Sequence, residues 1–334
     1  MNKTDLITLA HGNGGRHMRE LVDNLFAKKL SNPLLDTSVD ACHLQLDSPD
    51  ICFTTDGFTV KPLEFPGGTI GSLAIHGTVN DLAVSGSTPK YLSLNAFIEE
   101  GMPFEQLERI LDDMAQAAQV CNVQIVAGDT KVLPLHEASG VYFATTGIGL
   151  YNPNFNLGMD KIQPGDKILV NGSIGDHGTA VMLAREQYGL SGRLESDSAS
   201  VYPFTYALSQ LEGVRFMRDP TRGGLATVSV EITRQAKLGC YLHSTQIPIK
   251  PQVAAVCEIL GYDPYYLACE GRVIAIVDEQ QAQQALALWQ QLPGGEDAAI
   301  IGEITQQPRV ILETELGGQR VLDELEDDPL PRIC

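Results

Sequence analysis

Apolar and polar residues follow two periods along this chain, one typical of helices and one typical of strands. Apolar residues recur at helical spacing in the segments 18–26, 71–84, 104–118, 253–260 and 282–289. Shorter apolar or alternating runs of strand character occupy 51–55, 91–98, 123–127, 141–147, 167–172, 272–277 and 309–313. Because the two kinds of element are interspersed, the pattern predicts an α/β or α+β fold rather than a helical bundle or a β-sandwich.

Two changes in composition divide the chain. Turn-forming residues crowd between Asn152 and Asp166, and no apolar period crosses them, which predicts a domain boundary there. After Glu313 the sequence becomes acidic, with seven acids from Glu313 to Asp328, so we expect this segment to bury little. We therefore predict an N-terminal domain over 1–155, a C-terminal α/β domain over 156–313 and a mobile tail over 314–334.

Overall composition narrows the classes of function. The chain has 334 residues, 43% of them hydrophobic, which is enough for a sizeable core and about two domains. Its formal net charge of −19 repels nucleic acid phosphates and anionic lipid, so we expect neither a nucleic acid nor a membrane partner. No apolar stretch approaches the ~20 residues of a membrane span, and the N-terminal apolar run is too short for a secretory signal. We expect a soluble cytoplasmic protein.

Cysteines and short motifs exclude several kinds of site. The seven cysteines contain no C-x-x-C pair, which disfavours a disulfide framework or a zinc ribbon. Six are interpreted as core thiols, and the seventh, Cys334, is the last residue of the chain. The sequence also lacks the H-E-x-x-H, G-x-S-x-G, P-loop and G-x-G-x-x-G patterns. If a nucleotide binds, it therefore uses a different cradle.

Acidic residues follow apolar runs at several points in the chain. Asp56, Asp129 and Asp219 each come after such a run, and Asp81 stands beside Asn80 in a helical segment. Strand ends in open α/β sheets commonly bind ligands, and converging carboxylate and amide oxygens suit Mg²⁺ with phosphate. Any one of these acids, taken singly, fits equally well as a helix cap or a turn residue. For the group as a whole we favour a ligand-binding role.

Glycine-rich segments precede predicted helices. They are HGNGG at 11–15, GGTIGS at 67–72, GSIGDHG at 172–178 and TRGGLA at 221–226. The unpaired backbone N–H groups at a helix start suit phosphate, and the helix dipole adds to this preference. Glycine also serves turns and close packing, so each segment alone predicts little. Together with the acids, they indicate a phosphate-binding protein.

Several motifs, in order along the chain, resemble one enzyme superfamily. The glycine-rich N-terminus, TTDG, NDLAVSGSTP, GDT, TGIG and RDPTRGGLA resemble the ATP-dependent superfamily of aminoimidazole ribonucleotide synthetase, selenophosphate synthetase and thiamine monophosphate kinase. Within it, HGNGGR, HGTVNDLAVSGSTP, GDTKV, GSIGDHG, ACEGR and the terminal PRIC look like the HypE family of hydrogenase maturation factors, the carbamoyl dehydratases. The resemblance covers essentially the whole chain.

The resemblance implies a fold, ligands and partners. The fold is a two-domain α/β, aminoimidazole ribonucleotide synthetase-like one with a flexible C-terminal tail. Its N-terminal domains pair in a homodimer, and ATP and Mg²⁺ bind between the domains. HypE members receive a carbamoyl group on the C-terminal cysteine from the carbamoyltransferase HypF and dehydrate it to a thiocyanate. The cyano group then passes to iron held by the HypC–HypD complex and becomes a ligand of the NiFe-hydrogenase active site.

This chemistry assigns roles to particular residues. An amide oxygen leaves poorly, so transfer of the ATP γ-phosphoryl group to it precedes elimination to S–C≡N. We assign catalytic roles to Cys334 as carrier, Glu270 as base for the carbamoyl nitrogen protons, and Lys131 as stabiliser of developing charge. The residues assigned to ATP and phosphate are Gly12, Gly14, Gly15, Asp56, Asn80, Asp81, Asp129, Thr130 and Asp219, and those assigned to Mg²⁺ are Asp56, Asp81, Asp129 and Asp219.

Other interpretations stay open at the level of the sequence. Without the resemblance, Lys131 reads as a solvated surface lysine and Glu270 as a helix or turn cap. The 18 residues from Gly317 to Cys334 would reach ~60 Å if extended at about 3.3 Å per residue. This length allows the Cys334 thiol either to lie in the cleft of its own chain or to reach a partner protein. A small-molecule kinase or synthetase of the same superfamily would not need this tail. A non-enzymatic carrier would only present its thiol to partners.

Overall fold

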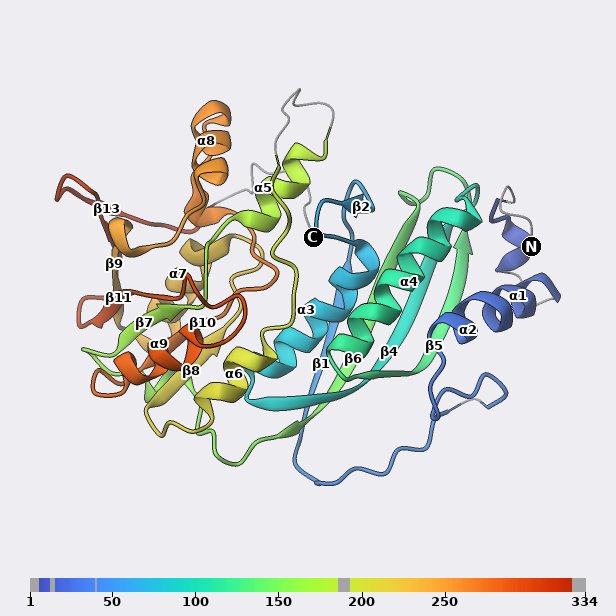
Figure 1. Ribbon diagram of the computed structural model, residues 1–334, viewed down its shortest axis with the longest axis horizontal. Coiled ribbons are helices and arrows are strands. Elements are labelled where there is room, and N and C mark those ends of the chain that lie inside the picture. The colour runs from blue at the N-terminus through green and yellow to red at the C-terminus, as the bar shows by residue number, and fades with distance from the viewer. Residues whose placement is uncertain (1–5, 13–15, 40, 186–192, 326–334) are drawn as a thin grey trace. The chain divides into compact units, whose positions relative to one another are not determined.

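A computed structural model of the protein describes residues 6–12, 16–39, 41–185 and 193–325. These residues form two compact units (Figure 1). Of the described residues, the first unit contains those up to Leu82 and from Ser87 to Tyr151, and the second contains Ala83–Gly86 and those from Asn152 to Leu325. Each unit has its own main sheet and its own buried core.

The first unit is built on a four-stranded sheet with the strand order β1-β6-β4-β5. These strands are β1 (Ile51–Phe58), β4 (Ser87–Glu99), β5 (Gln124–Leu133) and β6 (Val141–Tyr151). The parallel pair β4 and β5 is joined by α4 (Phe104–Val120), while β6 pairs antiparallel with both β1 and β4. The strands β1 and β5 are therefore the two edges of the sheet.

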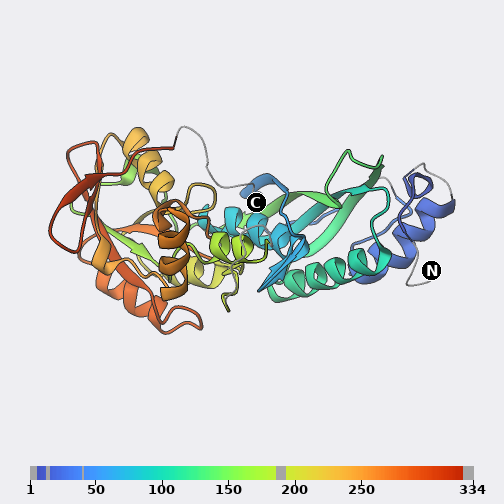
Figure 2. The same cartoon turned by 90° about the horizontal axis from the view of Figure 1, so that it is seen from above.

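Two helices, α3 (Ile70–Val84) and α4, cover one face of this sheet (Figures 1 and 2). Side chains along a strand alternate between faces, and in β4 Leu92 and Leu94 are buried while their neighbours Tyr91 and Ser93 are partly exposed. Close approach of α3 requires a glycine in β6, because a Cβ at Gly147 would lie 2.7 Å from the Thr78 Cγ2 atom. The shorter elements of this unit are η1 (Leu9–His11), α1 (Arg16–Leu21), η2 (Val22–Phe26), α2 (Ala27–Lys29), β2 (Glu64–Phe65) and β3 (Gly68–Thr69).

The second unit is built on a seven-stranded sheet with the order β13-β12-β9-β11-β7-β10-β8. Its strands are β7 (Lys167–Val170), β8 (Val214–Arg218), β9 (Gly239–His243), β10 (Ile274–Val277), β11 (Ala299–Thr305), β12 (Val310–Glu313) and β13 (Gln319–Val321). Its helices are α5 (Asp176–Leu183), α6 (Tyr202–Leu208), α7 (Gly224–Ala236), α8 (Pro251–Leu260) and α9 (Ala282–Gln290), with short turns η3 (Met159–Lys161), η5 (Ser244–Gln246) and η6 (Pro264–Tyr266). The core of this unit includes Leu225 and Ile232 of α7 packed with sheet residues such as Leu242 and Ile274.

The structure corrects the expectation that Asp56 and Asp129 stand at strand ends. Both lie inside strands, because β1 continues to Phe58 and β5 continues to Leu133. Phe58 is buried, and its ring fills the space beside Gly77 of α3, so burial keeps the strand extended beyond Asp56. In contrast, Asp219 directly follows β8, as the sequence indicated.

The segment after Glu313 packs against the second unit as far as Glu324, although its acidic composition predicted a mobile tail from residue 314. The strand β13 pairs with β12, and Leu322 is only 2% exposed. Three contacts fix the neighbouring residues to the second unit: Arg320 with Asp263, the Tyr266 hydroxyl with the Asp323 carbonyl, and Arg234 with Glu324. The residues from Leu325 to Cys334 number ten, so the chain beyond these contacts could extend about 33 Å at about 3.3 Å per residue, not ~60 Å.

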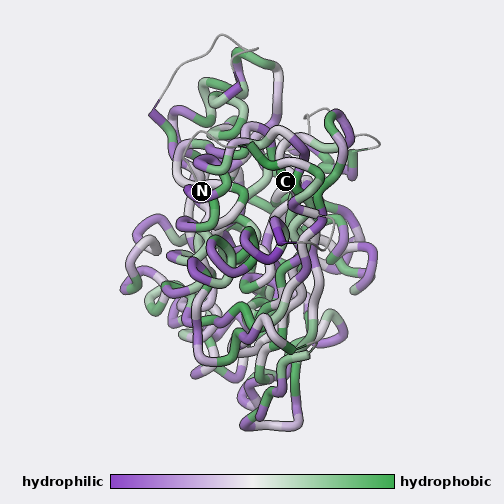
Figure 3. The backbone as a smooth tube through the Cα atoms, turned by 90° about the vertical axis from the view of Figure 1, so that its right-hand side faces the viewer, coloured by the Kyte–Doolittle hydropathy of each residue, from purple (hydrophilic) through white to green (hydrophobic). Residues whose placement is uncertain are grey.

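Hydropathy changes over short distances along the chain, and the tube in Figure 3 switches colour every few residues. Among the described residues, no helix is both long enough and apolar enough to cross a membrane.

Candidate functional site

In the first unit, α3 and β1 bring two of the predicted acids to one place. The Thr54 hydroxyl of β1 donates a hydrogen bond of 2.9 Å to the Asp81 carboxylate of α3. Asp56 lies two residues after Thr54 on the same face of β1, so strand geometry puts the two Cα atoms about 6.6 Å apart. The Asp56 Oδ1 accepts a hydrogen bond from the Gly57 N–H. Asn80, next to Asp81, is 1% exposed and belongs to the buried side of α3.

A second group lies on β5. The Lys131 ammonium is 2.7 Å from Asp129 Oδ2, and the Thr130 N–H donates to Asp129 Oδ1 at 2.8 Å. The hydrogen bond from Lys131 is the largest cause that holds the pKa of Asp129 below its ordinary value. Both charged side chains are about half exposed, whereas Thr130 is buried. Asp129 and Lys131 are therefore available to a ligand on one face of the strand.

The sheet register separates these two groups within one chain. Asp56 is opposite Thr145 of β6, which is opposite Leu94 of β4, which is opposite Gly128 of β5. Asp56 thus shares the face that packs on α3, while Asp129, one residue beyond Gly128, points to the other face. Three strand spacings of about 4.8 Å also put about 14 Å between the two edges. Asp56 and Asp129 of one chain cannot hold the same metal ion.

The glycine-rich N-terminal segment approaches the β5 group. A Cβ at Gly12 would lie 2.7 Å from the backbone nitrogen of Val132, the residue after Lys131. Gly12 ends η1, and its own N–H donates to the Leu9 carbonyl. Close contact with β5 therefore explains the glycine at this position. The two other predicted glycines, Gly14 and Gly15, lie outside the described residues, as does Cys334.

In the second unit, three sequence motifs far apart in the chain meet at Cys269, the residue before Glu270. The Cys269 N–H donates to the Pro220 carbonyl at 3.0 Å, which joins ACEGR to the segment that follows Asp219. At the start of α5, the Gly175 N–H donates a hydrogen bond of 3.1 Å to the Cys269 sulfur. Asp219 is 9% exposed and Glu270 is 3% exposed. GSIGDHG, RDPTRGGLA and ACEGR thus form one buried site region.

Charged residues that the sequence did not single out surround this region. Asp176 of α5 is fully buried and binds the Lys250 ammonium and the Ser173 hydroxyl at 2.6 Å each. Burial is the largest influence on the pKa of Asp176 and raises it, while the bonds from Lys250 and Ser173 oppose this rise. Arg272 reaches both Asp176, at 3.4 Å, and Asp197, at 3.5 Å. Asp176 lies inside GSIGDHG, which the sequence analysis singled out for its glycines at a helix start rather than for its acid, and Asp197 follows no recognisable pattern.

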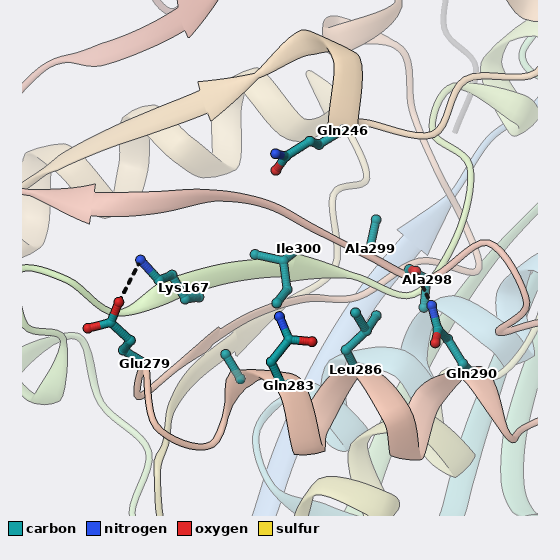
Figure 4. Close-up of a pocket in the computed structure, with 10 residues that line it drawn as sticks. Lys167, Gln246, Glu279, Gln283, Leu286, Gln290, Ala298, Ala299 and Ile300 are labelled. Atoms are coloured by element: carbon teal, nitrogen blue, oxygen red, sulfur yellow. Dashed lines mark hydrogen bonds and ion pairs between the residues drawn. The ribbon is translucent and has the colours of Figure 1, made fainter.

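One cavity of the second unit is lined by other residues than these. It has a volume of about 730 Å³ and opens between α9 and the strands β7 and β11 (Figure 4). Lys167 at its rim is already paired with Glu279 at 3.1 Å and Glu303 at 2.7 Å. None of the predicted site residues lines this cavity.

Metal-binding capacity rests on pairs of acids rather than on a larger cluster. Among the described residues, no three or more His, Cys, Asp or Glu side chains are grouped so as to hold a metal ion. The hard oxygen donors of Asp56 and Asp81 nevertheless suit Mg²⁺, which commonly takes one or two carboxylates and completes its shell with phosphate and water.

Comparison with known proteins identifies the class of this chain. Residues 38–151 match the family model described as AIR synthase related protein, N-terminal domain, and residues 163–315 match the corresponding C-terminal domain. Carbamoyl dehydratase HypE of Azotobacter vinelandii is 42% identical, and the alignment covers 100% of both chains. The chain is therefore a two-domain AIR synthase-related protein.

Two solved structures sharpen this assignment. One is the hydrogenase maturation protein HypE in complex with ATP, with a TM-score of 0.92 and 42% identity over 98% of this chain and 99% of that chain. The other is a HypE–HypF complex, with a TM-score of 0.81 and 40% identity over 91% of this chain and 99% of the matched chain. The chain belongs to the HypE family of carbamoyl dehydratases, the enzymes of hydrogenase maturation. The predicted fold class, family and enzyme class are confirmed.

Proposed function

We propose that this chain uses ATP and Mg²⁺ to remove water from a carbamoyl group carried on the thiol of its own Cys334. One observation carries the proposal for the second unit: three motifs distant in sequence meet at Cys269, the residue that precedes the buried Glu270. A buried carboxylate among phosphate-type glycine segments is suited to act as a base beside a phosphorylated group. Cys334 enters the proposal through the PRIC sequence at 331–334, one of the motifs that resemble HypE proteins.

The proposed reaction balances with ATP as the acceptor of water. The carbamoyl oxygen attacks the γ-phosphorus, ADP leaves, and the oxygen becomes part of a phosphate group. Glu270 takes one proton from the carbamoyl nitrogen and later releases it to solvent, and the departing phosphate takes the second nitrogen proton as the C–O bond breaks. The products are Cys334 thiocyanate, ADP and phosphate. Lys131 stabilises the negative charge that develops on the transferring group.

The first unit supplies the groups that suit nucleotide phosphates. Lys131 and Thr130 lie on β5 beside Gly12, and Asp56 lies with Asp81 where β1 meets α3. Because the sheet register keeps these two groups apart in one chain, we propose that a single ATP meets the β5 group of one copy and the Asp56–Asp81 pair of a second copy. We assign Mg²⁺ to Asp56 and Asp81, and we assign Asp129 to the orientation of Lys131, because their 2.7 Å pair fixes the ammonium. Mg²⁺ supplies charge neutralisation of the phosphates. Asp219, in the second unit, is proposed for a further phosphate-bound ion, and Asn80, Gly14 and Gly15 for the nucleotide.

The similarity to solved structures supports the proposed ligands and partners. The relative crystallised with ATP shares 42% of its sequence with this chain, which supports ATP as the nucleotide. The relative in the HypE–HypF complex supports HypF as the carbamoyl donor. We further propose a HypC–HypD complex as the acceptor of the cyano group. None of the six cysteines among the described residues forms a disulfide. We also propose a cytoplasmic location.

A homodimer is proposed from the uncovered face of the first unit's sheet. The strand β1 is a sheet edge, and its Ile51 and Phe53 are 40% and 67% exposed on the face away from α3. Tyr91 and Phe97 of β4 and Ile148 of β6 share that face by alternation and are partly exposed. Exposed apolar residues on an edge strand favour pairing with another chain. A second copy, joined through this face, would cover them.

The test follows the mass of the tail peptide. Carbamoylated wild-type protein is incubated with ATP and Mg²⁺, and the peptide that contains Cys334 should lose one water. Cys334→Ala should fold and bind ATP but yield no cyanated species. Cyanation at another cysteine would contradict the assignment. Turnover of a small substrate by a chain without residues 329–334 would instead favour a small-molecule kinase.

A further inference from the structure

We propose that Asp197 is a positioning residue for Glu270, whose buried carboxylate fixes the backbone that carries the base. This inference rests on the proposed role of Glu270 and adds a second residue to it. Asp197 lies outside the three motifs, in a segment without regular secondary structure. Its side chain is 0% exposed.

The two oxygens of Asp197 accept hydrogen bonds from consecutive backbone amides. Oδ1 accepts the Glu270 N–H and Oδ2 accepts the Gly271 N–H, both at 3.2 Å. Hydrogen bonds to an ionised carboxylate are stronger than those to neutral acceptors. Arg272 supplies the countercharge, with its Nε at 3.5 Å from Oδ2. A single carboxylate therefore binds the peptide on both sides of the Glu270 Cα atom.

The backbone around Asp197 completes this contact. The Ala199 N–H donates to the Glu270 carbonyl at 3.4 Å, so the two segments exchange hydrogen bonds in both directions. A Cβ at Gly271 would lie 1.8 Å from the Asp197 carbonyl oxygen. Glycine is therefore required at position 271 for the segments to approach this closely.

The opposite side of the same segment is held by Asn171. Its amide nitrogen donates to the Gly271 carbonyl at 3.3 Å, and its oxygen accepts the Val273 N–H at 2.8 Å. Asn171 is completely buried, and β10 begins only at Ile274. Side chains, rather than a sheet or helix ladder, thus hold the backbone of residues 270–273.

This arrangement makes the position of Glu270 sensitive to Asp197. A displacement of a reacting group by about 1 Å costs about 100-fold in rate. Asp197→Asn keeps the size of the side chain but turns one acceptor into a donor, which then faces a backbone N–H. We expect this substitution to shift the Glu270 backbone and to slow dehydration at least tenfold.

A purely structural role for Asp197 would give a different pattern, and Asp166 provides the matched control. Asp166 is a buried aspartate of the same unit, 4% exposed, that accepts the Gln163 N–H at 2.7 Å and lies 3.8 Å from Arg215. Asp166→Asn therefore removes a comparable buried charge without touching the Glu270 segment. The loss of stability in this variant measures the general cost of such a change.

The experiment uses four variants: Asp197→Asn, Asp166→Asn, Glu270→Gln and the double variant Asp197→Asn/Glu270→Gln. For each variant we would measure the ATP affinity, the melting temperature and the single-turnover rate of dehydration of carbamoylated protein at saturating ATP. Asp197→Asn should slow dehydration at least tenfold with ATP affinity within twofold of wild type. In the Glu270→Gln background it should change the rate less than twofold, because residues that act through one another are not additive. Asp166→Asn should leave the rate within twofold.

Three results would overturn the positioning role: a normal rate in Asp197→Asn, an equal slowing in Asp166→Asn, or an equal factor from Asp197→Asn when Glu270 is already replaced. Normal dehydration by Glu270→Gln would instead remove the proposed base, so the two failures are distinguishable. If Asp197→Asn does not fold, Asp197→Glu takes its place. It keeps the charge and both oxygens but moves them by one methylene, and it should slow dehydration in the same pattern.

Discussion

Leu322 anchors the chain that leads to Cys334, and Leu322→Ala tests this anchoring. Leu322 is 2% exposed, and its N–H donates to the Val310 carbonyl at 3.0 Å, whereas all three residues of β13 are exposed. Replacing a buried leucine by alanine costs about 2–5 kcal/mol. The other contacts of this segment are two largely exposed ion pairs, made by Arg320 and Glu324, and one hydrogen bond to the Asp323 carbonyl. Exposed ion pairs contribute only about 0–1 kcal/mol each, so we expect the segment from Gly317 to detach while the rest of the second unit stays folded.

Detachment lengthens the tail, and the size of the effect follows from the lengths. The ten residues from Leu325 to Cys334 become the 18 residues from Gly317 to Cys334. Effective concentration falls roughly as the −3/2 power of length, which gives a decrease of about 2.4-fold, or about 0.5 kcal/mol. Single-turnover dehydration should therefore slow about two- to threefold, with unchanged ATP affinity.

Hydrogen exchange at residues 319–324 and the dehydration rate are measured on the same variant. Leu316→Ala is the matched control, because Leu316 is 98% exposed in the turn before β13 and should affect neither. Unchanged exchange in Leu322→Ala would show that Leu322 is not the anchor. Faster hydrogen exchange together with dehydration slowed more than about tenfold would contradict the estimate from tail length. Leu322 would then orient the tail as well as shorten it.

Three further predictions concern the base, the β5 ion pair and the dimer. Glu270→Gln should slow dehydration about 100-fold or more while ATP still binds, as measured by single turnover and calorimetry. Lys131→Met should raise the pKa of Asp129 toward its ordinary value in a carboxyl NMR titration, because Lys131 is the largest cause of the lowered pKa. The stabilisation from this pair is present above the unfolded pKa of Asp129 and is lost as pH falls through the lower folded pKa, so the variant should lose less stability on acidification. Phe53→Asp should convert a dimer to a monomer in size-exclusion chromatography with light scattering.

Each of these has a control and a contrary outcome. Glu258→Gln, on an exposed position of α8, should leave dehydration unchanged, and a normal rate in Glu270→Gln would assign the base elsewhere. An unshifted Asp129 titration in Lys131→Met would show that the pair does not form in solution. Val120→Asp changes an exposed apolar residue of α4, 74% exposed and away from β1, and should not alter the oligomeric state. A dimer that survives Phe53→Asp would place the interface on another face.

Local pattern predicted the elements well where the period was long. The apolar stripe with Leu107, Leu111 and Met114 gave α4, and the alternation through Leu92 and Leu94 gave β4. The pattern missed β11, where Gly302 interrupts the apolar run. This glycine is required by packing against β9, since a Cβ there would lie 2.1 Å from the Tyr241 carbonyl oxygen. That requirement comes from the partner strand and is invisible in a local window.

The sequence predicts the segments of the candidate site but not how they are arranged. The motifs around Glu270 could be found because each contains glycines and acids in a recognisable order. The separation of Asp56 from Asp129 could not, because it depends on the strand order that puts β1 and β5 at opposite edges. Asp197 carried no signal either, since its role comes from hydrogen bonds to residues more than 70 positions away. Tertiary pairing of this kind is not encoded in local periodicity.

We propose that this chain uses ATP to dehydrate a carbamoyl group on its own Cys334. The most direct measurement is the mass of the peptide containing Cys334 after carbamoylated protein is incubated with Mg²⁺, with and without ATP. We expect the loss of one water from that peptide only when ATP is present, with one ADP formed per water lost. Loss of water without ATP, or ATP hydrolysis with the carbamoyl group on Cys334 intact, would contradict it.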